Sequence, residues 1–453
     1  MTGLLTEPDV RLLLEDRFAS MAREHRTPGA QIAIHHRGET VTAEFGEPEH
    51  GSGLAITADD AFPIGSITKC FTATVAMILV ADADIELDEP LGEHLPELVD
   101  EATRRLTLRH VLSHTGGLAS GPDSDDITTV SPARYVADHV RAHNVVLPAG
   151  TGFSYSNMGY VLVGRLIEAI TGMTWREATE SILLRPLGIT AAFIDVPAVP
   201  ASGNRRRATG HSVNAALGRI RPVLQSLAPV EAPTGALALS ATDLVSFGRM
   251  HTGRGLPQIL EGPYAELMRE DLPAAEPFGL ADGWGLGLAM YQDGGNTWVG
   301  HDGNAHGTSC YLRVDPVDEW IVAFTSNSNT GHALWRDLLA ELAGTMRVPV
   351  PAARSWVSRS RPVAPPMEYV GTYANGDVEY VVADDENGAL TLSVDGDTPA
   401  RLTLFEDLTF SMRDPESGKS VFGGRFLRDP DTGNADRVQL GGRLAQRCPS
   451  HVH

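Results

Sequence analysis

A serine and a lysine about one helical turn apart are the first residues that could do chemistry. Ser66 and Lys69 begin a long apolar run that predicts a helix, so both side chains project from one helix face. Among 36 basic residues only two are lysines, Lys69 and Lys419. A desolvated lysine can lose its proton near neutral pH, whereas an arginine stays protonated. The pattern predicts a serine nucleophile with a lysine base, at a helix N-terminus that favours a developing anion.

A tyrosine and an asparagine form a second motif. Tyr155 and Asn157 lie in a Gly-rich loop that precedes a predicted helix. A phenol, with an ordinary pKa near ~10, becomes a usable base when a cation sits beside it. The Asn157 amide has both a donor and an acceptor, so it can orient the lysine or a substrate carbonyl.

A third motif, His301-Asp302-Gly303, stands at the end of a predicted strand and is followed by Asn304. A glycine at such a position lets a substrate lie against the strand edge without meeting a Cβ atom. By itself this motif is more simply a strand-end turn; beside the other two motifs, we expect Gly303, with Asp302, to contact substrate.

In this order the three motifs resemble those of the class C β-lactamase and penicillin-binding-protein superfamily of serine hydrolases, which includes esterases, D-aminopeptidases and transacylases. The resemblance covers roughly residues 10–346. It implies that Ser66 attacks a carbonyl, that Lys69 and Tyr155 accept and return its proton, and that Asn157 supports them. The backbone N–H groups of Ser66 and Asn304 are then expected to form the oxyanion hole.

The third motif departs from the usual Lys-Thr-Gly of β-lactamases. His301 replaces the lysine and stays among the expected catalytic residues. A histidine at this position does not distinguish peptidases, esterases and acyltransferases from one another. Asp302 replaces the threonine, and if it faces the cleft it would repel a substrate carboxylate and disfavour β-lactams. Because strand residues alternate between the two faces of a sheet, Asp302 could also point away.

The elements around the motifs predict two domains joined by a linker. Strand patterns at 31–36 and 40–45, then at 284–291, 297–300, 309–314 and 320–326, enclose a mostly helical region from about 87 to 187, and a helix follows at 332–346. The resemblance implies an α/β (α+β) β-lactamase/transpeptidase-like fold: an antiparallel sheet flanked by helices, with an all-helical subdomain. We expect this catalytic domain at 1–348, a Pro-rich linker at 349–366, and a small all-β, lipocalin-like barrel at 367–453.

Composition excludes several classes of function. The net charge of −22 opposes binding to nucleic acid or to an anionic membrane surface. No apolar run is long enough to span a membrane and the N-terminus lacks the features of a secretory signal, so we expect a cytoplasmic protein. Three widely spaced cysteines indicate neither disulfides nor a metal site, and Cys70 is expected to pack rather than react. His110 and His114 lack the pattern of a zinc hydrolase, and His114 is expected to cap or buttress a turn.

We therefore predict an acyl-enzyme hydrolase or acyltransferase acting on an ester or amide of a small molecule, with no cofactor and no metal. Transfer to an amine acceptor, as in ester-to-amide exchange in secondary metabolism, is left open beside hydrolysis. A D-amino-acid peptidase or amidase is the alternative. A catalytically silent ligand-binding protein on the same fold is the rival from another class. The oligomeric state is left open.

Overall fold

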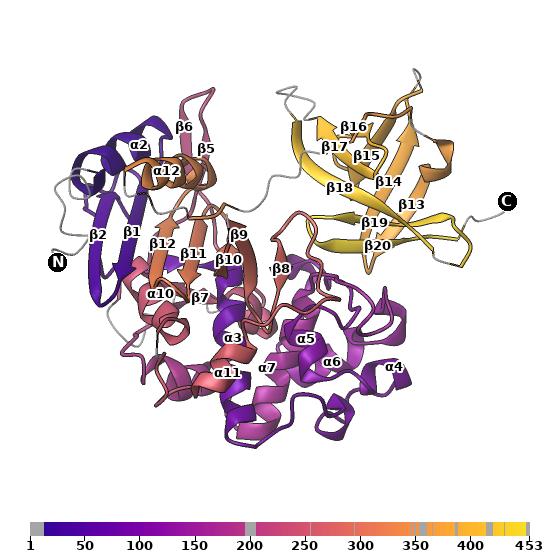
Figure 1. The fold of residues 1–453 in the computed structure, drawn as a ribbon, viewed down its shortest axis with the longest axis horizontal. Helices are drawn as coiled ribbons and strands as arrows, with labels where there is room; N and C mark the ends of the chain where they lie inside the picture. Colours follow the sequence, from indigo (N-terminus) through magenta and orange to yellow (C-terminus); the bar gives the residue numbers. More distant parts are fainter. Residues whose placement is uncertain are drawn as a thin grey trace.

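The structure, a computed structural model, describes residues 13–194, 205–253, 255–293, 295–345, 347, 350–352, 360–364, 366–385, 388–413, 420–429 and 431–449. A seven-stranded sheet with the strand order β2-β1-β12-β11-β10-β9-β8 forms its centre, and every neighbouring pair is antiparallel (Figure 1). The strands are β1 Gly29–His36, β2 Glu39–Gly46, β8 Gly283–Trp284, β9 Ala289–Asp293, β10 Asn296–Gly303, β11 Ser309–Asp315 and β12 Trp320–Ser326.

Both faces of this sheet are covered, which explains why β11 and β12 are buried along their whole length. One face packs against α2 Phe18–Glu24 and α12 Gly331–Thr345, through an aromatic cluster that includes Trp298, Phe324 and Trp335. The opposite face packs on α10 Ala241–Gly248, and its core continues into α3 Thr68–Ala81. Alternate residues of one strand therefore enter two different cores.

The region between the outer strands is mostly helical, as predicted. Its longest helix is α7 Asn157–Thr171, which packs against α3. The shorter helices are α4 Glu101–Arg104, α5 Leu108–Leu112, α6 Pro132–His139, α8 Trp175–Ala178, α9 Ala232–Gly235 and α11 Gly262–Leu267. Small sheets join β3 Phe62–Pro63, β7 Leu237–Leu239 and β4 Ala192–Phe193, and also β5 His211–Asn214 and β6 Arg219–Pro222. This arrangement confirms the mixed α/β fold class.

The C-terminal region is a closed eight-stranded antiparallel barrel with its own hydrophobic core. Its strands are β13 Gly371–Asn375, β14 Val378–Asp384, β15 Leu390–Val394, β16 Ala400–Leu404, β17 Thr409–Arg413, β18 Ser420–Arg428, β19 Ala435–Leu440 and β20 Arg443–Arg447. Pairing of β13 with β20 closes the barrel, which leaves no free sheet edge. The predicted barrel is therefore confirmed, whereas much of the predicted linker at 349–366 lies outside the described residues.

One difference from the predicted elements has a clear cause. The strand predicted at 284–291 is two strands, because residues 285–288 form a tight turn in which Gly287 has a φ of +83°. Gly287 also lies where a Cβ atom would be 2.2 Å from the Ala73 Cβ on α3, so the turn brings the sheet against that helix.

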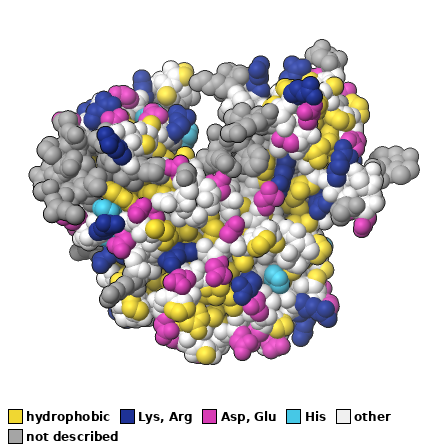
Figure 2. Space-filling model, in the orientation of Figure 1, with side chains coloured by type: hydrophobic (Ala, Val, Ile, Leu, Met, Phe, Trp, Pro, Cys, Tyr) yellow, Lys and Arg dark blue, Asp and Glu magenta, His cyan; other side chains and the backbone are white. Residues whose placement is uncertain are grey.

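The surface carries acidic and basic side chains mixed together on the face that Figure 2 shows. In the part of the chain that the structure describes, no helix has the length and apolar character needed to cross a membrane. The same residues contain no group of three or more His, Cys, Asp or Glu side chains placed to hold a metal ion.

Candidate active site

Ser66 lies in a single 3₁₀ turn, Gly65–Ile67, immediately before α3. The turn starts at Gly65, which has a φ of +52° and whose Cβ position would be 2.3 Å from the Asn304 carbonyl oxygen. Only glycine allows so close an approach of the two backbones. The two N–H groups expected to form the oxyanion hole, from Ser66 and Asn304, therefore belong to segments that touch.

Lys69 is buried beside Ser66, with 1% of its surface exposed. Its Nζ donates hydrogen bonds to the Ser66 Oγ at 3.2 Å and to the Thr234 carbonyl oxygen at 2.9 Å. Burial, aided by the positive charge of Arg443 and opposed by Glu231, lowers the pKa of Lys69 to about 7. Near neutral pH the amine is thus neutral in a large share of molecules, as a base requires.

Tyr155 lies beside Ser66, but its electrostatic state differs from the sequence expectation. We expected a nearby cation to make the phenol a base. Burial instead raises the pKa of Tyr155 above its ordinary value, and the Ser66 hydroxyl and Arg443 offset only part of that rise. The aromatic ring lies 5.2 Å from the Lys69 Nζ. The phenol therefore keeps its proton, while Lys69 can lose its own.

His114 holds the tyrosine loop in place. Its Nδ1 accepts a hydrogen bond from the Ser156 N–H at 3.1 Å, and its ring packs against Tyr155 and Tyr160. Burial lowers the pKa of His114 well below its usual value, so the ring is neutral and its Nδ1 can accept. The expectation that His114 buttresses a turn is confirmed.

His301 and Asp302 point to opposite faces of β10. Asp302 lies beside the fully buried Arg313 of β11, with an ion pair of 2.6 Å, and also accepts from the Tyr291 hydroxyl at 3.2 Å. His301 instead packs on Tyr155 and Trp284 in the cleft. This position gives no support to Asp302 as a substrate-binding residue, because strand alternation directs it to the face covered by α12.

His301 is a neutral acceptor. Burial, with the charge of Lys69 nearby, lowers its pKa to about 4. Its Nδ1 lies 2.5 Å from the Asp302 carbonyl oxygen, so Nδ1 carries the proton and donates. The buried Nε2 is then an acceptor, and it has no hydrogen-bond partner among the residues that the structure describes.

Gly303 also has a different role from the expected one. A Cβ atom at this position would be 1.9 Å from the Ile64 carbonyl oxygen. The glycine is needed so that the end of β10 can pack on the chain that leads to Ser66, and a substrate contact is not required to explain it. The geometry thus corrects the reason that we gave for Gly303.

Asn157 begins α7 beside this cluster. Its N–H donates to the Ser120 carbonyl oxygen at 3.1 Å. The buried Asn157 Oδ1 has no partner within the described ranges. An open acceptor of this kind, two positions after Tyr155, suits contact with a substrate.

The barrel contributes a cation that the sequence did not reveal. The turn between β19 and β20 packs on the tyrosine loop, where the Tyr155 N–H donates to the Gly442 carbonyl oxygen at 2.9 Å. Arg443, the next residue, donates to the Ser120 Oγ at 2.9 Å and lies 5.5 Å from the Tyr155 ring. Asn375 of β13 strengthens the same contact, because its Oδ1 accepts a hydrogen bond from the Ser120 N–H at 2.7 Å. The only local signal was a Gly-Gly turn, which says nothing about the Ser120 contact 323 positions earlier in the chain.

The antiparallel sheet, the helical subdomain and the placement of Ser66 define the class of β-lactamase-fold serine hydrolases. The Beta-lactamase family model matches residues 14–344, and the chain belongs to this family. It is 32% identical over 385 residues to penicillin-binding protein 4 of Amycolatopsis lactamdurans, covering 79% of this chain and 96% of that protein.

Solved structures agree with the same fold. The crystal structure of SurE is similar with a TM-score of 0.87 and 38% identity, covering 97% of this chain and 99% of SurE. SurE has also been solved with D-Leu. A D-stereospecific amidohydrolase from Streptomyces sp. has a TM-score of 0.57 and 25% identity, covering 73% of this chain and 98% of that one.

Proposed function

We propose that this chain is an acyltransferase and hydrolase that forms an acyl-enzyme on Ser66 from esters or amides of D-configured amino acyl groups. The observation that carries this proposal is the buried amine of Lys69, 3.2 Å from the Ser66 Oγ and with a pKa of about 7. A base with a pKa near the working pH transfers protons most effectively.

In the first half of the reaction the Ser66 Oγ attacks the carbonyl carbon and its proton passes to the Lys69 Nζ. The N–H groups of Ser66 and Asn304 receive the developing oxyanion. The proton then moves to the leaving alcohol or amine, with the protonated Tyr155 hydroxyl as its carrier. The bond to the leaving group breaks, and the acyl group remains as an ester on Ser66.

In the second half a nucleophile attacks that ester and must lose a proton. Water gives a free acid, whereas an amine gives an amide. The unpartnered His301 Nε2 supports the amine route, because it is a neutral acceptor that can take a hydrogen bond from an attacking amine, whose proton passes to the Lys69 Nζ and from there to the Ser66 Oγ as the acyl–oxygen bond breaks.

The D-configuration comes from the relatives. SurE, 38% identical, has been solved with D-Leu, and a second relative is named as a D-stereospecific amidohydrolase. We infer that the acyl carbon bound by Ser66 carries a D-residue.

The test is intact-protein mass spectrometry after brief mixing with D-leucyl and L-leucyl p-nitrophenyl esters, with and without a primary amine. The proposal expects an adduct on wild-type protein from the D-ester, its absence in Ser66→Ala, and its faster loss when amine is added. Ser246→Ala, on α10, is the matched control and should acylate as the wild type does. No adduct and no turnover with either ester would favour the ligand-binding alternative.

A second candidate, a D-amino acid amidase, is favoured by the amidohydrolase relative. It shares the acylation step and differs in the leaving group and the final nucleophile. Turnover of D-leucinamide with no effect of added amine on product composition would select it over the transferase.

A further inference from the structure

We propose that Glu231 binds an ammonium group of the substrate in the Ser66 cleft. This inference rests on the proposed function and names the charge that its substrate carries. Glu231 ends the turn Pro229–Glu231 and caps α9, the helix whose Thr234 carbonyl oxygen accepts from Lys69.

Glu231 differs from the other buried acids of the described residues. Three acidic side chains are buried there, Asp60, Glu231 and Asp315, each at most 3% exposed. Asp60 is held by the guanidinium of Arg206 and by Thr57, and Asp315 accepts from backbone N–H groups and from Asn296. Buried carboxylates normally have such partners, because an unpaired one is costly.

Glu231 is only partly paired. Ser124 donates a hydrogen bond to its carboxylate, but Oε2 is buried without a partner in the described part of the chain. Burial raises its pKa, whereas Ser124 and Lys69 act against that rise. The charges of Lys69 and Glu231 act on each other, and the Lys69 Nζ donates to the helix that Glu231 caps. A substrate that reaches Lys69 therefore meets the charge of Glu231.

Another open polar atom lies near Glu231. The Tyr135 hydroxyl is buried without a partner among the described residues, and the charges of Glu231 and Asp377 act on it. Asp123 adds negative charge to the surroundings of Glu231, and Lys69 is the cation that acts on it.

These charges and open oxygen atoms determine which kind of ligand can bind here. A carboxylate or phosphate would meet Glu231 and Asp123 with like charge, whereas an ammonium group brings positive charge and three N–H donors for the open oxygen atoms. A metal ion does not fit, because the described residues contain no group of three His, Cys, Asp or Glu side chains placed for one.

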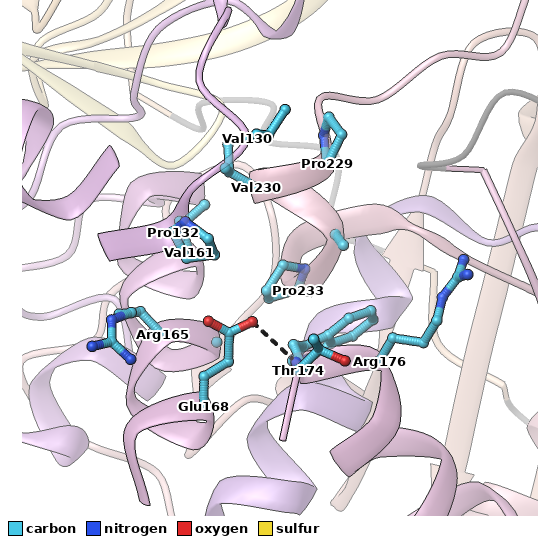
Figure 3. A pocket seen from close by; sticks show the side chains of 13 residues that line it. Val130, Pro132, Val161, Arg165, Glu168, Thr174, Arg176, Pro229, Val230 and Pro233 are labelled. Carbon is cyan, nitrogen blue, oxygen red and sulfur yellow. Dashed lines mark hydrogen bonds between the residues drawn. The ribbon is translucent and has the colours of Figure 1, made fainter. Parts of the chain in front are cut away.

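The control residue, Glu168, lines a neighbouring cavity. This cavity has a volume of about 210 Å³ and is lined by residues of α7, α8 and α9, including Val161, Trp175 and Pro233, with neither Lys69 nor Glu231 among its described lining residues. Figure 3 shows Glu168 among the side chains that line this cavity, and its carboxylate accepts from the Trp175 N–H at 3.2 Å. Burial raises the pKa of Glu168 too. Glu168→Gln therefore changes a similar carboxylate that has a backbone partner.

The experiment compares two donors, a D-leucyl ester with its free amine and the N-acetylated ester, in wild type, Glu231→Gln and Glu168→Gln. The readout is the ratio of kcat/KM for the two donors, in which any change in Lys69 cancels because both donors use it. Glu231→Gln is expected to lower this ratio about tenfold or more, the usual effect of removing a hydrogen bond to a charged group. Glu168→Gln should keep the wild-type ratio.

A second arm tests whether the ammonium belongs to the acceptor. With the N-acetylated donor, the amine concentration that gives half-maximal transfer would rise about tenfold in Glu231→Gln if Glu231 binds the acceptor. Tyr135→Phe keeps every charge and is a milder variant. It should raise the same half-maximal amine concentration, by a smaller factor. An unchanged donor ratio together with an unchanged amine dependence overturns the inference, as does an equal effect of Glu168→Gln. If neither donor acylates wild-type Ser66, the proposed function fails instead.

Discussion

Asp302 and His301, on the two faces of β10, differ in whether their side chains have hydrogen-bond or ion-pair partners. On the face under α12, Asp302 has the guanidinium of Arg313 at 2.6 Å and the Tyr291 hydroxyl at 3.2 Å. On the cleft face, His301 has a buried Nε2 without a partner in the described ranges. Two neighbouring residues of one strand thus differ in whether their side chains have partners, and a buried polar atom without a partner needs an explanation.

The largest effect is expected from Lys69→Met, which removes the base on the cleft face. We expect kcat/KM to fall about a thousandfold or more, because general base catalysis typically contributes 10²–10⁴-fold. Steady-state kinetics with a D-leucyl ester measures it. Lys419→Met, the change of the other lysine, is the control and should keep wild-type kinetics.

The same variant should also gain stability at low pH. The folded pKa of Lys69 is about 7 against 10.5 for an ordinary lysine, so folding opposes its protonation. This cost grows as pH falls from 10.5 and is complete below about 7. Thermal unfolding should show a larger gain for Lys69→Met at pH 6 than at pH 10, and an equal gain at both would contradict the lowered pKa.

A change on the opposite face of β10 should instead lower stability and leave the substrate preference unchanged. Asp302→Asn leaves the fully buried Arg313 without its ion pair, and breaking a buried pair costs roughly 3 kcal/mol or more of unfolding free energy. Denaturant unfolding measures the loss. Because Asp302 lies away from the cleft, the folded variant should treat cationic and neutral donors alike; a selective loss with cationic donors would return Asp302 to the substrate site.

The smallest effect is expected from Arg443→Gln in the barrel turn. Arg443 lowers the pKa of Lys69, so its loss should raise that pKa and move the acidic limb of the kcat/KM profile to higher pH. We expect a loss of a few fold near pH 6.5 that recovers near pH 9. Arg437→Gln, on β19 of the same hairpin, is the control. An unshifted limb would show that the barrel does not tune the base.

The motif residues could be selected from the sequence because each has a local signature. The Ser66-Lys69 spacing and the scarcity of lysine need only a few residues to be recognised, and the strands of the large sheet show clear apolar runs. The direction of Asp302 needed the register of β10 with β11, which places it beside Arg313, and a motif carries no register. Arg443 and Glu231 reach Lys69 only through tertiary contacts. The raised pKa of Tyr155 follows from burial, which local sequence does not determine.

The pH dependence of Ser66 acylation tests the central claim most directly, namely that neutral, buried Lys69 is the base. Rapid mixing with an N-acetylated D-leucyl p-nitrophenyl ester, whose donor does not titrate, gives the burst rate between pH 5.5 and 9.5. The burst rate should rise with pH, with an apparent pKa of about 7, and then stay level. A rate that still rises toward pH 9.5 would mean an ordinary lysine or a tyrosine base, and a rate independent of pH would remove Lys69 from that role.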